Sequence, residues 1–139
     1  MQKLVIDTNV LVSALIQRNY PFFIVYHCIL ENIVEVCISD ELFEEYLDVL
    51  YRPKFSKYPD FLVKAESVLA QIESKATKFF PKERFEIIDD KNDNRLLELA
   101  YESNADFIIT GNTNDFVMNI FKGTRIVSPK DYWDSYRLE

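Results

Sequence analysis

The chain has 139 residues, of which 48% are hydrophobic, and it carries a formal net charge of −7. This length predicts one domain spanning residues 1–139, and the hydrophobic content excludes a disordered chain. The acidic balance argues against a general nucleic-acid coat protein, and no apolar run approaches the ~20 residues that a membrane span needs.

Short apolar segments alternate with helical patterns along the chain. The strand candidates are, in chain order, Lys3–Ile6, Val34–Ile38, Phe85–Ile88, Phe107–Thr110 and Arg125–Val127. The helical patterns begin after Asp7, at Pro21, after Ser39, near Asp60, at Asn92 and at Ser128. Strands that alternate with helices predict an α/β sandwich built around a mainly parallel sheet.

Polar residues follow three of the predicted strands where each strand ends. They are Asp7 after the first strand, Asp89, Asp90 and Asp93 after Phe85–Ile88, and Gly111, Asn112 and Asp115 after Phe107–Thr110. Ligands in open parallel sheets bind beyond the carboxyl ends of the strands, so we expect these side chains at one edge. A cation would offset the repulsion among the acids, and oxygen ligands without His or Cys indicate Mg²⁺ or Mn²⁺. Such a site suits the hydrolysis of a phosphodiester.

The helix that begins after Ser39 contributes a further acid, Glu45. At about 100° per residue, its buried stripe comprises the apolar residues Leu42, Phe43, Tyr46, Leu47, Val49 and Leu50. Glu45 lies at the border of this stripe, whereas Glu44 points further toward solvent. Glu45 is therefore the better candidate for a half-buried acid directed at the site.

Each acid also has a purely structural interpretation. Asp7 could cap a helix, and Asp93 could lie in the first turn of one. Asp89 and Asp90 are more simply explained as solvated loop acids. The prediction of a site therefore rests on the joint placement of the acids at strand ends.

Four segments carry a resemblance to a known family. They are Val5–Ala14, Ser39–Tyr46 together with Val49–Phe55, Asp90–Asn94 and Ala105–Asn112. In this order they resemble the motifs of PIN-domain ribonucleases over nearly the whole chain. The resemblance is nearest to the branch that contains toxins of type II toxin–antitoxin modules.

The resemblance implies a three-layer α/β/α sandwich, a PIN-like Rossmannoid fold, with Mg²⁺- or Mn²⁺-dependent endoribonuclease activity on single-stranded RNA. It assigns the metal-binding and catalytic acids to Asp7, Glu45 and Asp93. The supporting polar residues would be Thr8, Asn9 and Thr110, with Thr8 or Asn9 hydrogen-bonding the first acid. The family also implies a separate cognate antitoxin as a protein partner, and it commonly forms homodimers.

One position departs from the family pattern, because Asn112 stands where the fourth acid usually follows the Thr-Gly pair. Asparagine can still ligate or orient a water through its carbonyl oxygen, but it removes a negative charge. A second metal would then bind less well. Asp115 could reach back if the intervening turn is helical. One-metal catalysis, rescue by Asp115 and an impaired enzyme all remain open, and activity is the leading interpretation.

A basic, aromatic loop follows the Glu45 helix. In it Arg52, Lys54 and Lys57 alternate with aromatic residues, namely Tyr51, Phe55 and Tyr58. Such a loop could hold phosphates and stack bases. It could equally be an ordinary solvated loop whose aromatic side chains anchor it to the core.

The alternative from another functional class is a catalytically impaired PIN-fold module that binds RNA or a protein partner. A phosphatase or a phospho-accepting receiver ranks last, because no lysine ends the last predicted strand. Cys28 and Cys37 favour buried free thiols in a reducing cytosol. The chain reaches Asp7 before a signal-peptide apolar region can form, so we expect a cytoplasmic protein without membrane association.

Overall fold

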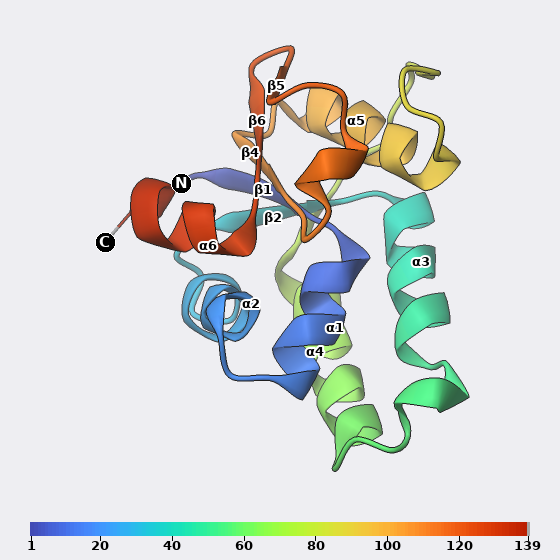
Figure 1. Cartoon of the computed structure of the whole chain (residues 1–139), viewed down its shortest axis with the longest axis vertical. Helices are drawn as coiled ribbons and strands as arrows, with labels where there is room; N and C mark the ends of the chain where they lie inside the picture. The colour runs from blue at the N-terminus through green and yellow to red at the C-terminus, as the bar shows by residue number, and fades with distance from the viewer. Residues whose placement is uncertain (139) are drawn as a thin grey trace.

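A six-stranded sheet forms the centre of the computed structural model, which describes residues 1–138 (Figure 1). Its strands lie in the order β3-β2-β1-β4-β6-β5. Their bounds are β1 Lys3–Ile6, β2 Glu35–Ile38, β3 Thr77–Lys78, β4 Phe107–Ile109, β5 Ile120–Phe121 and β6 Thr124–Val127. All neighbouring strands are parallel except β5, which runs antiparallel to β6.

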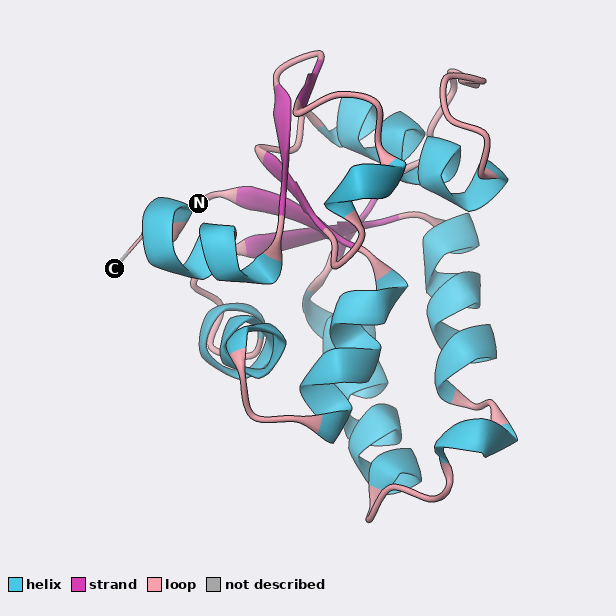
Figure 2. Ribbon diagram, viewed as in Figure 1, coloured by secondary structure: helices cyan, strands magenta, loops and turns pink. Residues whose placement is uncertain are grey.

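Helices cover both faces of this sheet. Their bounds are α1 Thr8–Ile16, α2 Tyr20–Phe23, α3 Asp40–Leu50, α4 Phe61–Lys75, α5 Lys91–Ser103 and α6 Pro129–Asp131. Figures 1 and 2 show α1, α2 and α4 on one side of the sheet and α5 on the other. The predicted three-layer α/β/α sandwich with a mainly parallel sheet is therefore confirmed.

The central strands are apolar because both of their faces are covered. Every residue of β4 is buried, and in β1 only Lys3 is partly exposed. In register, Leu4 lies beside Phe107 and Ile6 beside Ile109. Burial of such side chains stabilises the fold by about 1.5–3 kcal/mol each. Both strands then end at the same edge, where the polar residues begin.

The helix α3 begins and packs largely as its sequence predicts. The Ser39 side chain caps it by accepting a hydrogen bond from the Leu42 amide at 3.1 Å. Leu42, Tyr46 and Leu50 are buried, but Leu47 is 38% exposed, so the predicted stripe is too wide on that side. The buried Tyr46 hydroxyl donates to the Ile6 carbonyl oxygen at 2.5 Å and ties α3 to the end of β1.

The predicted strand Phe85–Ile88 is wrong. This segment is extended, but its amides donate to side chains of α5 instead of to a neighbouring strand. The sheet is extended instead by β3, which pairs with β2 through Cys37 and Thr77. Two residues, both exposed, form β3, so no hydrophobic alternation marks it.

Among residues 1–138, no helix combines the length and hydrophobicity needed to cross a membrane. Cys28 and Cys37 are both buried free thiols, as predicted.

Candidate active site

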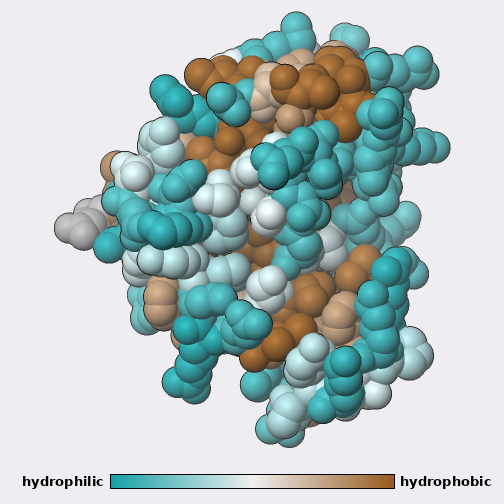
Figure 3. All heavy atoms as spheres, in the orientation of Figure 1, coloured by the Kyte–Doolittle hydropathy of each residue, from teal (hydrophilic) through white to brown (hydrophobic). Residues whose placement is uncertain are grey.

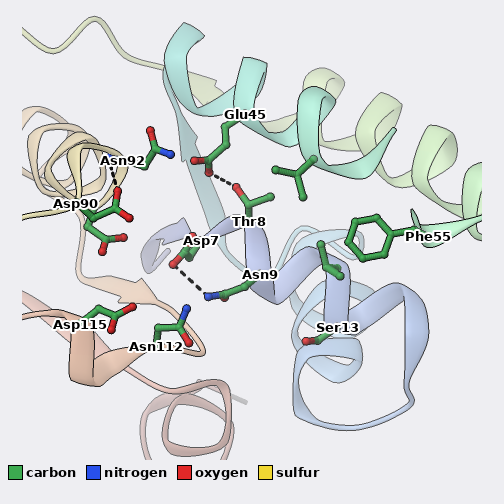
Figure 4. Close-up of a pocket in the computed structure, with 13 residues that line it drawn as sticks. Asp7, Thr8, Asn9, Ser13, Glu45, Phe55, Asp90, Asn92, Asn112 and Asp115 are labelled. Atoms are coloured by element: carbon green, nitrogen blue, oxygen red, sulfur yellow. Dashed lines mark hydrogen bonds between the residues drawn. The ribbon is translucent and has the colours of Figure 1, made fainter. Parts of the chain in front are cut away.

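A solvent-open cavity of about 400 Å³ lies at the carboxyl ends of β1 and β4 (Figure 4). Its walls come from α1, α3, the start of α5 and the segment that follows β4. Five carboxylates line it: Asp7, Glu45, Asp90, Asp93 and Asp115. No lysine or arginine belongs to the lining, which is drawn entirely from residues 1–138. The cavity therefore collects negative charge without an internal counter-ion.

Asp7 stands between β1 and α1, and its side chain turns toward the cavity. It occupies the N-cap position of α1 but makes no capping hydrogen bond. Instead the Thr110 hydroxyl donates to Asp7 Oδ2 at 2.7 Å, and Asn9 Nδ2 donates to the same oxygen at 3.4 Å. Burial raises the pKa of Asp7, the Thr110 bond lowers it, and repulsion from Glu45 raises it further.

Glu45 enters the cavity from α3 and is half-buried, while Glu44 is exposed, as predicted. The Thr8 hydroxyl donates to Glu45 Oε2. The side chain of Thr8, one of the two residues expected to support Asp7, therefore supports Glu45 instead. The reason is that α1 packs against α3, and this packing turns Thr8 toward Glu45. Asn9, the other residue considered for that support, does contact Asp7.

Asp93 lies in the first turn of α5 and is partly exposed. Among residues 1–138 no hydrogen-bond donor contacts its carboxylate. Burial, followed by repulsion from Asp90, Asp7, Asp115 and Glu45, raises the pKa of Asp93 to about 7. The acids of the cavity are thus close enough to oppose one another's ionisation.

Asp90 is exposed, as the sequence interpretation expected, but it also lines the cavity. Its Oδ1 caps α5 by accepting a hydrogen bond from the Asn92 amide at 2.8 Å. Its charge raises the pKa of Asp93 and Asp7. The sequence feature that could have identified Asp90 as a lining residue is its position directly before α5, the helix that carries Asp93. Asp89 is exposed and does not line the same cavity.

Asn112 and Asp115 approach the cavity together. The Asn112 amide donates to the Thr110 hydroxyl at 3.1 Å, which places Asn112 beside the group that holds Asp7. A short 3-10 helix, Thr113–Asp115, follows and brings Asp115 to the same rim. The sequence interpretation required a helical turn before Asp115 if this residue was to reach the site, and the structure has that turn.

Two buried side chains of α5 hold the extended segment that leads to Asp90. The Asn94 carbonyl accepts from the Ile87 and Ile88 amides at 3.0 and 2.9 Å, and its amide donates to the Ile88 carbonyl oxygen at 2.6 Å. One turn later, Glu98 accepts from the Phe85 amide at 2.8 Å. Asn94 and Glu98 do for this segment what a neighbouring strand does elsewhere.

The basic loop after α3 touches the cavity through one residue, Phe55, which stacks on Phe61 with ring centroids 5.0 Å apart. Arg52 pairs with Asp48 at 3.0 Å. The Lys54 and Lys57 ammonium groups lie over the rings of Phe55 and Tyr58. Lys54 and Lys57 are exposed but do not line the cavity.

The donor set fits a hard divalent cation. Within residues 1–138, no three acidic, histidine or cysteine side chains stand close enough to enclose an ion by themselves. Mg²⁺ usually keeps several waters and takes only one or two protein carboxylates, so a looser ring of oxygen ligands suits it. Carboxylate and amide oxygens, with no sulfur or imidazole, are the ligands that Mg²⁺ and Mn²⁺ prefer.

Comparisons with known proteins agree with this geometry. The family model of the PIN domain matches residues 3–114. An uncharacterised protein of Methanocaldococcus jannaschii is 33% identical over 109 residues, which cover 78% of this chain and 70% of that protein. PIN domains are generally nucleases that typically use divalent metal ions. On the match over residues 3–114, this chain belongs to the PIN domain family.

Proposed function

We propose that the protein is a Mg²⁺- or Mn²⁺-dependent endoribonuclease that hydrolyses phosphodiester bonds of single-stranded RNA, with Asp7, Glu45 and Asp93 holding the metal in part through its bound waters. The observation that carries this proposal is the ring of five carboxylates around one open cavity with no basic residue in its lining. Burial, followed by repulsion from the neighbouring acids, raises the pKa of Asp93 to about 7. A cluster of partly buried acids is costly for a fold unless a cation offsets it.

Supporting hydrogen bonds give two of the three candidate ligands a defined orientation. Thr110 and Asn9 hold Asp7, and Thr8 holds Glu45. Partners of this kind commonly fix ligand geometry and tune metal affinity. A bound divalent ion would polarise the phosphodiester and activate the attacking water. The role of the candidate ligands would be to keep the ion and the substrate phosphate next to each other.

Of the three outcomes for Asn112, we favour rescue by Asp115. Asp115 lines the same cavity, and its charge raises the pKa of Asp93. Asn112 also lines the cavity, and its side-chain carbonyl oxygen can orient a water. Together they offer one carboxylate and one neutral oxygen where the family usually has a fourth acid.

Substrate and partner roles are part of the same proposal. Arg52, Lys54 and Lys57 would attract the RNA backbone to the edge of the cavity marked by Phe55. We further propose that the protein acts in the cytoplasm as the toxin of a toxin–antitoxin module. A cognate antitoxin would then be a separate chain, and the protein would form a homodimer.

Cleavage of a labelled, unstructured RNA tests the proposal, with Mn²⁺, Mg²⁺ or EDTA present. The Asp7→Asn variant is purified in parallel, and Glu44→Gln, an exposed acid on α3, serves as the control for the charge change. We expect cleavage by the wild type and Glu44→Gln with either metal, and none with EDTA or Asp7→Asn. Metal-independent cleavage, or cleavage that survives in Asp7→Asn, would contradict the site.

The alternative is a PIN-fold module that binds RNA or a protein partner without cleaving, and Asn112 is the observation in its favour. That module would retain RNA in a binding assay while folded protein leaves every RNA intact with every metal. An Asn112→Asp variant that gains cleavage would then identify the position responsible.

A further inference from the structure

A second hollow of about 360 Å³ adjoins the acidic cavity and shares Asp90, Asp93 and Asp115 with it. Its remaining lining comes from the extended segment before α5 and from the chain after the 3-10 helix: Ile87, Ile88, Asp89 and Val117. We call it the side hollow. Because three carboxylates line both spaces, the side hollow lies directly beside the acidic cavity.

The side hollow has apolar walls that water reaches. Val117 is 72% exposed and Ile87 is 41% exposed, while Ile88 is buried. Single exposed apolar residues are common, but two from separate segments that line one concave space are a feature of binding sites. In Figure 3, hydrophobic side chains gather at the end of the molecule that carries α5 and the β5–β6 hairpin.

The polar groups of the side hollow are carboxylates, with no side-chain donor among its lining residues. The Asp89 carboxylate has no hydrogen-bond or ion-pair partner within residues 1–138. The backbone at Ile87 and Ile88 is fixed by Asn94, so this wall is already formed before a ligand binds. A ligand here would present apolar faces together with N–H donors.

We propose that the side hollow binds the nucleobase next to the scissile phosphate, with Asp89 accepting a hydrogen bond from an amino group of that base. This inference rests on the proposed nuclease function. The proposed metal ion would attract the substrate phosphate to the acidic cavity, whereas the side hollow would offer a phosphate only carboxylates. The base therefore enters the side hollow while the backbone stays in the acidic cavity. The two walls contact the faces of the base, and Asp89 contacts its edge.

The carboxylates that line the side hollow also predict which bases bind there. Carboxylates accept from the exocyclic amino group of cytosine in known recognition, and adenine and guanine carry an exocyclic amino group that can donate in the same way. Uracil presents two carbonyl oxygens beside a single N–H. Its carbonyl oxygens would therefore face the carboxylate oxygens of the side hollow, which repel them. The side hollow therefore favours amino-bearing bases over uracil, and Asp89 is the specificity-determining residue.

The test uses short single-stranded RNAs that are abasic at every position except one, which carries A, C, G or U. Cleavage in Mn²⁺ gives kcat/KM for each, and fluorescence anisotropy with Asp7→Asn gives binding without cleavage. We expect a roughly tenfold preference for an amino-bearing base over uracil in both assays. Asp89→Asn reduces this preference to about twofold, since an amide can donate to uracil. Val117→Ala raises KM for all four RNAs and leaves kcat unchanged.

Glu86→Gln is the matched control, because Glu86 is exposed on the same segment and lies outside the side hollow. Equal kcat/KM for all four bases, or the same specificity in Asp89→Asn and Glu86→Gln, would overturn the inference while leaving the nuclease intact. Base-dependent binding without any cleavage would support the side hollow and reject the proposed nuclease. Neither cleavage nor base-dependent binding would reject both.

Discussion

Replacing Asp93 by asparagine should stabilise the metal-free protein at alkaline pH. The pKa of Asp93 is about 7 in the fold against an ordinary value of 3.8. An acid whose pKa is raised on folding binds more protons in the folded state, so stability is lost as pH rises from about 4 to about 7. Asparagine is neutral throughout and avoids this loss.

The raised pKa sets the size of the effect. The difference corresponds to about 4 kcal/mol at a pH above both values. Because the Asp93 carboxylate is partly exposed, solvent screening reduces the expected gain to about 1–2 kcal/mol. For a domain of this length, that raises Tm by about 3–8 °C.

Thermal unfolding in EDTA at pH 8 and pH 5 measures this gain, with Glu44→Gln as the control for net charge. We expect Asp93→Asn to exceed the wild type at pH 8, to approach it at pH 5, and Glu44→Gln to change little at either. Saturating Mn²⁺ should reverse the order, since an ion at 100 times its Kd stabilises the wild type by about 2.7 kcal/mol. An Asp93→Asn protein that is no more stable at pH 8 would refute the electrostatic reasoning.

Three further outcomes test how the site is held. Thr110→Val keeps the shape of the side chain but removes the hydroxyl that donates to Asp7. The Mn²⁺ affinity, measured by calorimetry, should therefore fall about 10–100-fold. An unchanged affinity would contradict the supporting role of Thr110. Asp115→Asn should weaken Mn²⁺ binding and Asn112→Asp should strengthen it, and shifts in the same direction would exclude compensation between the two positions. Asn94→Ala leaves the buried Ile88 amide without an acceptor, at a cost of about 1–3 kcal/mol, and also the partly buried Ile87 amide. Hydrogen exchange should therefore accelerate in the segment before α5 and not in β1.

The sequence predicts the central strands because burial on both faces leaves a strong signal. β1 and β4 are nearly continuous apolar runs, and each is followed by polar residues that line the cavity. Phe85–Ile88 has a similar composition but fails as a strand. Phe85 and Ile88 pack against the core while amides of the segment find side-chain acceptors. No pattern in the segment itself reveals those acceptors.

The site is less predictable than the fold because it depends on contacts between distant elements. Asp7, Glu45 and Asp93 could be proposed from strand ends, helix periodicity and family resemblance. The contact of Thr8 with Glu45 requires the packing of α1 on α3, which no local pattern specifies. Asp90 both caps α5 and lines the cavity, and a capping aspartate alone looks like an ordinary loop acid.

The buried hydrogen bond from Tyr46 to Ile6 joins the residue after Glu45 to the residue before Asp7. The backbones that carry these two acids are therefore fastened to each other below the floor of the cavity, out of reach of any ligand. Asp90 and Asp93 come from α5, in the opposite layer, and reach the cavity by way of a segment fastened through side chains. If one metal ion is exchanged for another of different radius, we expect Asp7 and Glu45 to keep their separation. The change in ligand positions then falls to Asp90 and Asp93.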